Sequence, residues 1–293
     1  MASIREKYLQ WRNKALPASK HNIIDVHRRM SDEISKLDSR LDTLCNILAD
    51  IRRSQIEKAE RDAWIEFSAL PSSHEESKPE LVSHSNWMPH LSAKFNRPGI
   101  RILEIGSRNV TGGATRIPFS AAHYIGFDCY DGENVDVVGD AHKLSSYFRD
   151  EEKFDLILSS AVFEHFHMPW VVAHEIQKLL KVGGYVFVET HFSFSFHEKP
   201  WNFFQFSNMG LRALFNTALG FDLIDSGMSN PMNGVFSQEA DEYLRGKPVG
   251  ELYCHSEILC RKSRDVSEFD WSQVGIDVVG DNTRYPSPTR ITA

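Results

Sequence analysis

Residues 102–109 read Ile-Leu-Glu-Ile-Gly-Ser-Arg-Asn, an apolar run that ends in a tight glycine turn. In open α/β sheets the ligand binds beyond the carboxyl ends of the strands, where such a glycine lets the backbone come close to it. Gly106 would allow that approach, and Glu104 puts a carboxylate at the end of the predicted strand. A dinucleotide-binding fingerprint would read GxGxxG, but Arg108 stands at its second glycine, so a nicotinamide site is disfavoured.

Short apolar runs alternate with helical segments around this stretch, which favours parallel βαβ units with right-handed crossovers. The predicted strands are 100–105, 124–128, 135–138, 154–159 and 185–190, and the predicted helices are 87–95, 141–148, 169–180 and 207–219. Two late strands, 221–225 and 252–260, lack a strong helix between them. They predict an antiparallel edge on the parallel sheet.

A different periodicity marks the N-terminal part of the chain, where apolar residues recur in alternating steps of three and four. The a positions of this heptad seam are His27, Ile34, Leu41 and Leu48, and the d positions are Met30, Leu37, Leu44 and Ile51. A strict 3.5-residue repeat is narrow for a core helix, so it favours a coiled coil that joins copies of the chain through residues 23–51. The alternative is an amphipathic helix that packs on its own globular domain. Dimer and trimer both stay open.

Length and composition limit the class of protein. The 293 residues carry a net charge of −7 and 41% hydrophobic residues, which is ordinary globular usage and argues against a nucleic-acid binder. We find no transmembrane segment, no signal peptide and no CxxC pair, so we expect a cytoplasmic, reduced protein. The expected regions are a helical oligomerisation region at 1–70, a linker and lead-in helix at 71–97, an α/β domain at 98–263 and a tail at 264–293.

Acidic residues follow two further predicted strands. Asp128 ends the strand 124–128, where a carboxylate can accept hydrogen bonds from ribose hydroxyls; otherwise it is a turn aspartate. Asp140 follows a strand and begins a helix, so it is either an N-cap or an acceptor for an adenine amino group.

Five segments in this order and spacing resemble the class I S-adenosylmethionine-dependent methyltransferases, over about residues 98–262. They are LEIGSRN at 103–109, YIGFD at 124–128, VVGDAH at 137–142, FDLILSSAVFEH at 154–165 and KLLKVGGYVFVETH at 178–191. They are especially similar to a bacterial small-molecule and glycan branch that reads EIGS, GVD, DAH and LEH at these places. The resemblance implies S-adenosylmethionine as cofactor. It also implies a Rossmann-like, seven-stranded, mostly parallel sheet with an antiparallel last strand.

The resemblance also implies a set of cofactor contacts. They are Glu104, Gly106 and Ser107 at the methionine end, Asp128 at the ribose, Cys129, Asp140 and Ala141 around the adenine, and Ser159 and Ser160 under the sulfonium. Many family members carry a second glycine where Arg108 stands, and we do not expect Arg108 to contact the cofactor.

Methyl transfer is an in-line displacement, in which positioning the nucleophile and excluding water supply much of the rate. A hydroxyl acceptor also benefits from a base with a pKa near the working pH, which favours histidine. His165, after the fourth strand, is the first candidate base, and His191, after the fifth, is the second. The alternatives are packing under the cofactor for His165 and a structural or substrate-orienting role for His191.

The segment 191–206 is aromatic and polar together, which suits stacking on a sugar or an aromatic face. It resembles an HxxPxDYWRF-like loop of the same branch. His197, Trp201 and Phe204 are the candidate acceptor contacts, and 228–247 is a second candidate wall. A plain hydrophobic lid is the alternative.

We therefore expect O-methylation of a sugar hydroxyl in a glycan or polysaccharide intermediate, with biosynthetic proteins as further partners. The alternatives are an O- or N-methyltransferase of an aromatic small molecule, a non-catalytic coiled-coil scaffold that binds the cofactor, and a nicotinamide oxidoreductase. The sequence shows no tight metal-binding signature, because the HxH pair of His165 and His167 cannot easily bring both rings to one face. We expect no metal ligands, although magnesium-assisted transfer stays open.

Overall fold

The computed structural model describes residues 4–12, 20–68, 78–110, 112–113 and 115–275. The chain divides into two compact units, Met1–Leu70 and Pro71–Ala293, and each is described by itself. Most of the predicted linker, 71–77, and most of the predicted tail, 276–293, lie outside the described residues.

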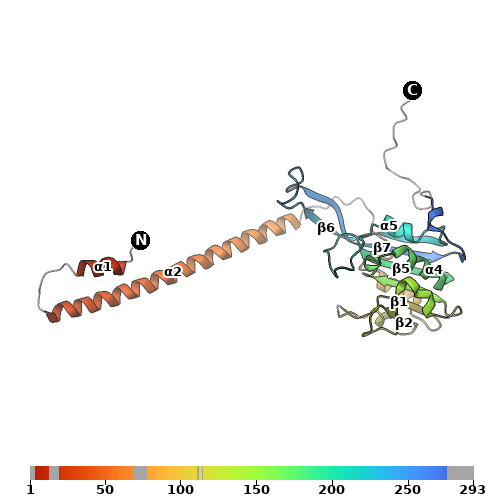
Figure 1. The fold of residues 1–293 in the computed structure, drawn as a ribbon, viewed down its shortest axis with the longest axis horizontal. Helices are drawn as coiled ribbons and strands as arrows, with labels where there is room; N and C mark the ends of the chain where they lie inside the picture. The colour runs from red at the N-terminus through yellow and green to blue at the C-terminus, as the bar shows by residue number, and fades with distance from the viewer. Residues whose placement is uncertain (1–3, 13–19, 69–77, 111, 114, 276–293) are drawn as a thin grey trace, which may run out of the picture. The chain divides into compact units, whose positions relative to one another are not determined.

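The described residues of the first unit form two helices, α1 (Ile4–Arg12) and α2 (Lys20–Ser68), drawn in red and orange in Figure 1. Neither glycine nor proline interrupts the 49 residues of α2, so nothing in its sequence breaks the helical hydrogen-bond ladder. The predicted seam follows this helix, and most of its apolar side chains are exposed; Leu48 is 64% exposed. The ring of Tyr8 in α1 lies 5.4 Å from that of His27, so α1 packs beside the first predicted a position.

Unit 2 is built on one seven-stranded sheet (Figure 1). Its strands are β1 (Arg101–Ile105), β2 (His123–Asp128), β3 (Val137–Val138), β4 (Phe154–Ser160), β5 (Leu180–His191), β6 (Phe221–Val235) and β7 (Pro248–Lys262). Its α-helices are α3 (Trp87–Phe95), α4 (Pro169–Leu179) and α5 (Asn208–Leu214), and its 3₁₀ elements are η1 (Ile117–Phe119), η2 (Ala141–Tyr147), η3 (Phe163–His165) and η4 (Trp271–Gln273). The strand order is β3-β2-β1-β4-β5-β7-β6.

The pairings confirm the predicted fold class. Strands β1 to β5 pair in parallel, and the last strand, β7, is antiparallel to both of its neighbours, β5 and β6. The antiparallel strand lies inside the sheet rather than at its edge, which is formed by β6. Strands β6 and β7 are also longer than predicted, because they continue as a two-stranded ribbon beyond the end of β5, up to the pair Val235 and Pro248.

Two predicted helices differ in the structure, in both cases because side chains bind backbone groups that a helix needs. The segment 141–148 forms the kinked 3₁₀ element η2, in which the Ser145 amide donates to the Glu175 carboxylate at 2.7 Å. The segment 207–219 is α-helical only to Leu214, since the Asn216 side chain binds the Ala213 carbonyl and the Leu219 amide.

Each face of the sheet carries its own apolar layer. One layer packs the sheet against α4 and α5, and the other packs it against α3, where Trp87 stacks on Phe187 with ring centroids 4.8 Å apart. Strand β4 is buried on both faces, as expected of a central parallel strand. Each fully buried large apolar side chain stabilises such a layer by about 1.5–3 kcal/mol.

The end of β7 is fastened by a buried lysine. Lys262 is fully buried, and its Nζ donates to the carbonyls of Gln177 at 2.5 Å and Leu180 at 2.8 Å. The same ammonium pairs with Asp265 at 2.7 Å. This contact ties the last strand to the junction of α4 and β5.

Candidate active site

The turn after β1 requires glycine. Gly106 has a φ of +83°, and a Cβ at this position would lie 2.1 Å from a methyl carbon of Val162. Its amide and that of Ser107 donate to the Phe127 carbonyl at 2.8 and 3.2 Å. The Ser107 hydroxyl is buried and has no hydrogen-bond partner within the described part of the chain. This turn therefore offers close backbone approach and an unused polar group to a ligand.

Glu104 stands just before this turn and is almost fully buried. Its Oε2 accepts a hydrogen bond from the Tyr124 hydroxyl at 2.9 Å. Burial raises the pKa of the Glu104 carboxyl above its usual value, against the lowering effect of Thr115, Tyr124 and Arg116. A ligand ammonium would compensate this buried acid, which fits the methionine end of S-adenosylmethionine.

Asp128 ends β2, and its carboxylate is held from both sides. Oδ2 accepts from the Arg108 amide at 3.2 Å, Oδ1 accepts from the Tyr130 amide at 3.0 Å, and Arg108 Nε lies 3.7 Å from Oδ1. Arg108, which departs from the family pattern, is thus the cationic partner of the predicted ribose acceptor. Cys129 follows as an exposed thiol, whose pKa is raised by partial burial and by Asp128.

Asp140 caps η2. Its carboxylate accepts from the His142 amide at 2.9 Å and lies 2.7 Å from His142 Nδ1. These contacts match the N-cap alternative, and Ala141 is buried behind them. The two serines of β4 are also engaged: Ser159 donates to the Ile105 carbonyl at 3.0 Å, and Ser160 donates to Glu189 at 2.8 Å.

A cluster of histidines lies next to this region, around the buried Glu164. Thr190 Oγ1 donates to Glu164 Oε2 at 2.6 Å, and His191 Nδ1 lies 2.6 Å from Oε1. These last two atoms are close, but they are not aligned as a hydrogen bond. Burial raises the pKa of the Glu164 carboxyl, but its interactions with His191 and Thr190 outweigh that effect and hold the pKa below its usual value.

Backbone carbonyls fix the tautomers of two histidines in this cluster. His165 Nδ1 lies 2.8 Å from the Trp201 carbonyl, and His197 Nδ1 lies 2.8 Å from that of Ser195. A carbonyl only accepts, so each Nδ1 carries the proton and each neutral ring presents a lone pair at Nε2. The His165 Nε2 lies 3.9 Å from Glu164 Oε1. The ring centroids of His165 and His197 are 5.0 Å apart.

The remaining predicted acceptor residues differ from one another. Trp201 is exposed, while Phe204 packs against the core beside Trp170 and Phe206.

Sequence reasoning missed the part of the cluster that strand pairing assembles. His84 Nδ1 lies 2.9 Å from Glu189 Oε2, and the His84 ring stacks on His255 at 4.2 Å. Glu189 and Glu257 are both buried. Of these residues, only Glu189 could have been noticed in the sequence, because it is a charged residue in a largely apolar predicted strand.

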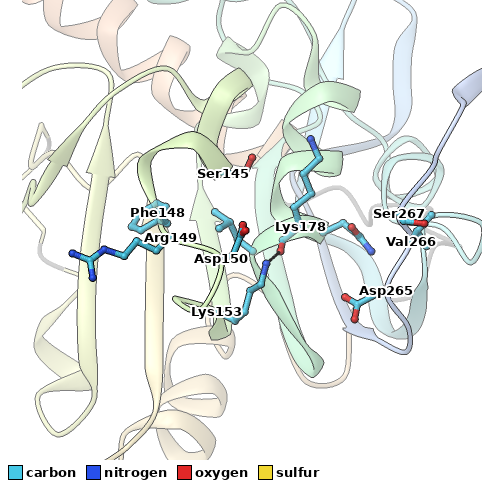
Figure 2. A pocket seen from close by; sticks show the side chains of 11 residues that line it. Ser145, Phe148, Arg149, Asp150, Lys153, Lys178, Asp265, Val266 and Ser267 are labelled. Carbon is cyan, nitrogen blue, oxygen red and sulfur yellow. Dashed lines mark hydrogen bonds between the residues drawn. The ribbon is translucent and has the colours of Figure 1, made fainter.

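A separate hollow of about 330 Å³ lies between η2, the end of α4 and the chain after β7. Figure 2 shows Lys153 reaching across it, where its Nζ donates to the Lys178 carbonyl at 2.5 Å. Lys153 immediately precedes β4, so this hollow lies at the amino end of that strand. The histidine cluster follows the carboxyl ends of β4 and β5 and is distinct from it.

Comparison with known proteins gives one family match. Residues 112–188 match the profile of the family described as a methyltransferase domain. No curated protein matches the sequence at a significant level. Among the described residues, no helix combines the length and apolar character that a membrane span needs.

Several solved structures are similar in outline at low identity. TehB from Haemophilus influenzae is 15% identical with a TM-score of 0.40, over 60% of this chain and 61% of that one. YcgJ from Bacillus subtilis is 18% identical with a TM-score of 0.42, over 60% and 97%. Magnesium protoporphyrin IX methyltransferase from Synechocystis, solved with bound S-adenosylmethionine, is 15% identical with a TM-score of 0.40, over 60% and 76%.

The family match falls on the segment between the glycine turn and the middle of β5. It covers the strands that carry Asp128, Ser159 and Ser160, and it begins five residues after Ser107. Residues 112–188 of the chain thus match a methyltransferase domain, for which S-adenosylmethionine is the implied cofactor.

Proposed function

We propose that this chain methylates a hydroxyl group of a sugar in a glycan or polysaccharide intermediate, with His165 as general base. The observation that carries the proposal is the fixed tautomer of His165. Its Nδ1–H donates to the Trp201 carbonyl, and its Nε2 lone pair lies beside the buried carboxylate of Glu164. A base needs a free lone pair and a partner that stabilises its protonated form, and His165 has both.

The residues around the glycine turn would hold the cofactor, which supplies an electrophilic methyl group when bound. Glu104 and Ser107 would bind its methionine end, and Asp128 would bind its ribose. His165 Nε2 then accepts the proton of the acceptor hydroxyl. The imidazolium that results is stabilised by Glu164, whose Oε1 lies 3.9 Å away.

Exposed aromatic rings beside His165 support a sugar acceptor. Large aromatic side chains are highly buried on average, but four of them are exposed here: Phe194, Phe196, Trp201 and Phe203. Sugar rings present C–H faces that stack on such surfaces, while neighbouring polar groups hold their hydroxyls. An aromatic small molecule would stack on the same rings, so it remains the second candidate.

The test measures transfer of labelled methyl groups to nucleotide sugars, oligosaccharides and phenols, by wild type and His165→Gln. We expect label on sugars, a kcat roughly 10²–10⁴-fold lower in the variant and an unchanged affinity for S-adenosylhomocysteine. His123→Gln, an exposed histidine of β2, is the matched control. Label on phenols would select the second candidate. Full turnover by His165→Gln would assign the base elsewhere, with His191 next in order. Cofactor binding without any transfer would favour a scaffold.

The exposed seam of α2 supports a homo-oligomer through residues 23–51. Leu37, Leu41 and Leu44 are each more than half exposed in the single chain, and their burial against a second copy would stabilise an assembly by about 1.5–3 kcal/mol per side chain. A coiled coil at this place would also bring the enzyme to biosynthetic partner proteins. The four cysteines are free thiols, which fits a reducing, cytoplasmic setting.

Sedimentation of the full chain tests the oligomer. We expect a dimer or trimer for wild type and a monomer for the double variant Leu37→Asp and Leu44→Asp, with methyl transfer by the domain retained. Asp42→Ala, at an exposed b position on the outer face of the same helix, should leave the assembly intact. If the wild-type chain sediments as a monomer, the proposed oligomer is wrong.

A further inference from the structure

We infer that His191, Cys254 and His255 form a binding site for a single divalent ion of the zinc type, with one coordination position left open. Their ligand atoms all lie within 4.8 Å of one another. The site shares His191 with the candidate bases for methyl transfer, but the inference rests on ligand geometry and does not depend on the acceptor proposed above.

Strand pairing brings the three residues together. His191 ends β5, and in the antiparallel register of β5 and β7 it stands directly opposite His255. The two imidazole centroids are 5.5 Å apart, and Cys254 Sγ lies 3.7 Å from His255 Nε2. Because all three positions belong to strands of one sheet, their backbones are fixed relative to each other before any ion binds.

Each imidazole is also held on the side away from the site. His191 Nδ1 faces Glu164 at 2.6 Å, and its ring stacks on Phe194 at 4.4 Å. His255 Nδ1 lies 3.0 Å from the side-chain amide of Asn230, and its ring stacks on His84. The facing amide atom is Asn230 Nδ2; with the amide turned by 180°, Asn230 Oδ1 accepts a hydrogen bond from Nδ1–H and leaves Nε2 as a ligand. A carboxylate or amide behind each histidine is the usual outer support of a metal site.

The ligand chemistry selects the ion. Two imidazoles and a thiolate suit zinc, whereas magnesium and calcium prefer oxygen ligands. Three protein ligands with a fourth position open is the arrangement of catalytic rather than structural zinc sites. The buried carboxylates Glu164 and Glu189 lie around the cluster and favour a cation there.

Two other groups have ligand spacing, and both are less suited. Glu164, His165 and His197 form one, but Glu164 Oε2 already accepts from Thr190, and Oε1 faces His191 Nδ1 at 2.6 Å. His84, Glu189 and His255 form the other. In that group His84 and Glu189 already pair, and the two rings stack with an interplanar angle of 17°, so their lone pairs do not converge. Neither group contains sulfur.

The sulfur ligand makes the experiment specific. Full-length protein is freed of metal with a chelator and titrated with Co²⁺ alone. We expect one equivalent to bind, with a thiolate-to-cobalt charge-transfer band in the near ultraviolet and displacement by Zn²⁺. Cys254→Ser should abolish that band, and His191→Gln or His255→Gln should weaken Co²⁺ binding by roughly 10²-fold or more. Circular dichroism checks that each variant folds.

Further variants distinguish the proposed site from the two other groups that have ligand spacing. Cys129→Ser, His165→Gln and His84→Gln should retain the band, and Glu164→Gln should weaken Co²⁺ binding about 10–100-fold without removing it. In wild type, Zn²⁺ should protect Cys254 from alkylation while the exposed Cys129 reacts at an unchanged rate, which needs no variant at all. A band that survives Cys254→Ser, or absence of the band in wild type, would overturn the inference. Failure of methyl transfer would leave these binding results unaffected.

Discussion

The carboxyl edge of the sheet has two halves that are built differently. In the predicted cofactor half, which comprises Glu104, Gly106, Ser107 and Asp128, each group lies at or just after the end of β1 or β2. In the histidine half, which comprises Glu164, His165, His191, His197 and His255, side chains from distant segments meet through strand register and a long loop. The first half follows short sequence motifs, whereas the second is complete only once β7 has paired with β5 and brought in His255.

The largest expected effect is that of a substitution in the glycine turn, which belongs to the predicted cofactor half. Gly106→Val should abolish cofactor binding and lower the free energy of unfolding by about 3 kcal/mol or more, since its Cβ would collide with Val162 at a positive φ. Denaturant unfolding and calorimetry with S-adenosylhomocysteine measure both. Gly113→Ala is the control, because its Cβ would meet nothing within 4 Å. Retained binding in Gly106→Val would show that the turn does not carry the cofactor.

In the histidine half, Glu164→Gln should lower kcat roughly 10²-fold or more and leave cofactor affinity unchanged, because it removes the charge that supports His165 and His191. The KM of the acceptor should change less than kcat, as expected of a positioning residue. Glu151→Gln, an exposed carboxylate in unit 2, is the control. A loss of cofactor affinity would mean that the two halves are not independent.

A smaller effect is expected at Ser107. Ser107→Ala should weaken binding of S-adenosylhomocysteine about tenfold and leave stability within about 0.5 kcal/mol, since the hydroxyl has no partner among the residues described. Ser159→Ala should do the reverse, costing about 1 kcal/mol of stability with little change in affinity, because Ser159 bonds the Ile105 carbonyl. Equal behaviour of the two variants would contradict this assignment.

The smallest effect concerns Glu104 and pH. Its pKa is raised in the folded state, so its contribution to stability is fully present below the unfolded pKa of 4.5 and is lost as pH rises towards and through the raised value. Glu104→Gln should therefore gain Tm relative to wild type as pH rises from 4.5, by about 2–4 °C for each kcal/mol, while binding cofactor more weakly. A Tm difference that is the same at pH 4 and pH 8 would argue against this titration.

The sequence predicted the sheet and the cofactor half because both depend on local patterns. Each parallel strand was found within a few residues, apart from the longer β5, and the antiparallel last strand was anticipated. The hydrogen-bond partners of individual polar side chains were harder to predict from the sequence. Asp140 serves as an N-cap and Ser159 bonds within the sheet, since a motif gives the position of a side chain but not its partner.

The histidine half was found only in part, for a physical reason. His191 and His197 stand in one stretch of aromatic and polar sequence, and His165 follows the fourth strand, but His84 and His255 join them only through the fold and strand register. No ligand spacing such as CxxC is present, because Cys254 and His255 meet His191 across two strands. The heptad seam was visible in the sequence, and its apolar side chains lie exposed on α2.

The place of β7 has a consequence for synthesis on the ribosome. The last strand to emerge fills a gap inside the sheet, between β5 and β6, so β5 keeps a bare edge until translation has passed Lys262. An unpaired strand edge is a template for wrong partners. The helix α2 has emerged long before that moment, and neighbouring nascent chains on one messenger can meet through it while their sheets are still open. If the seam of α2 joins copies of the chain as proposed, assembly would precede completion of the sheet.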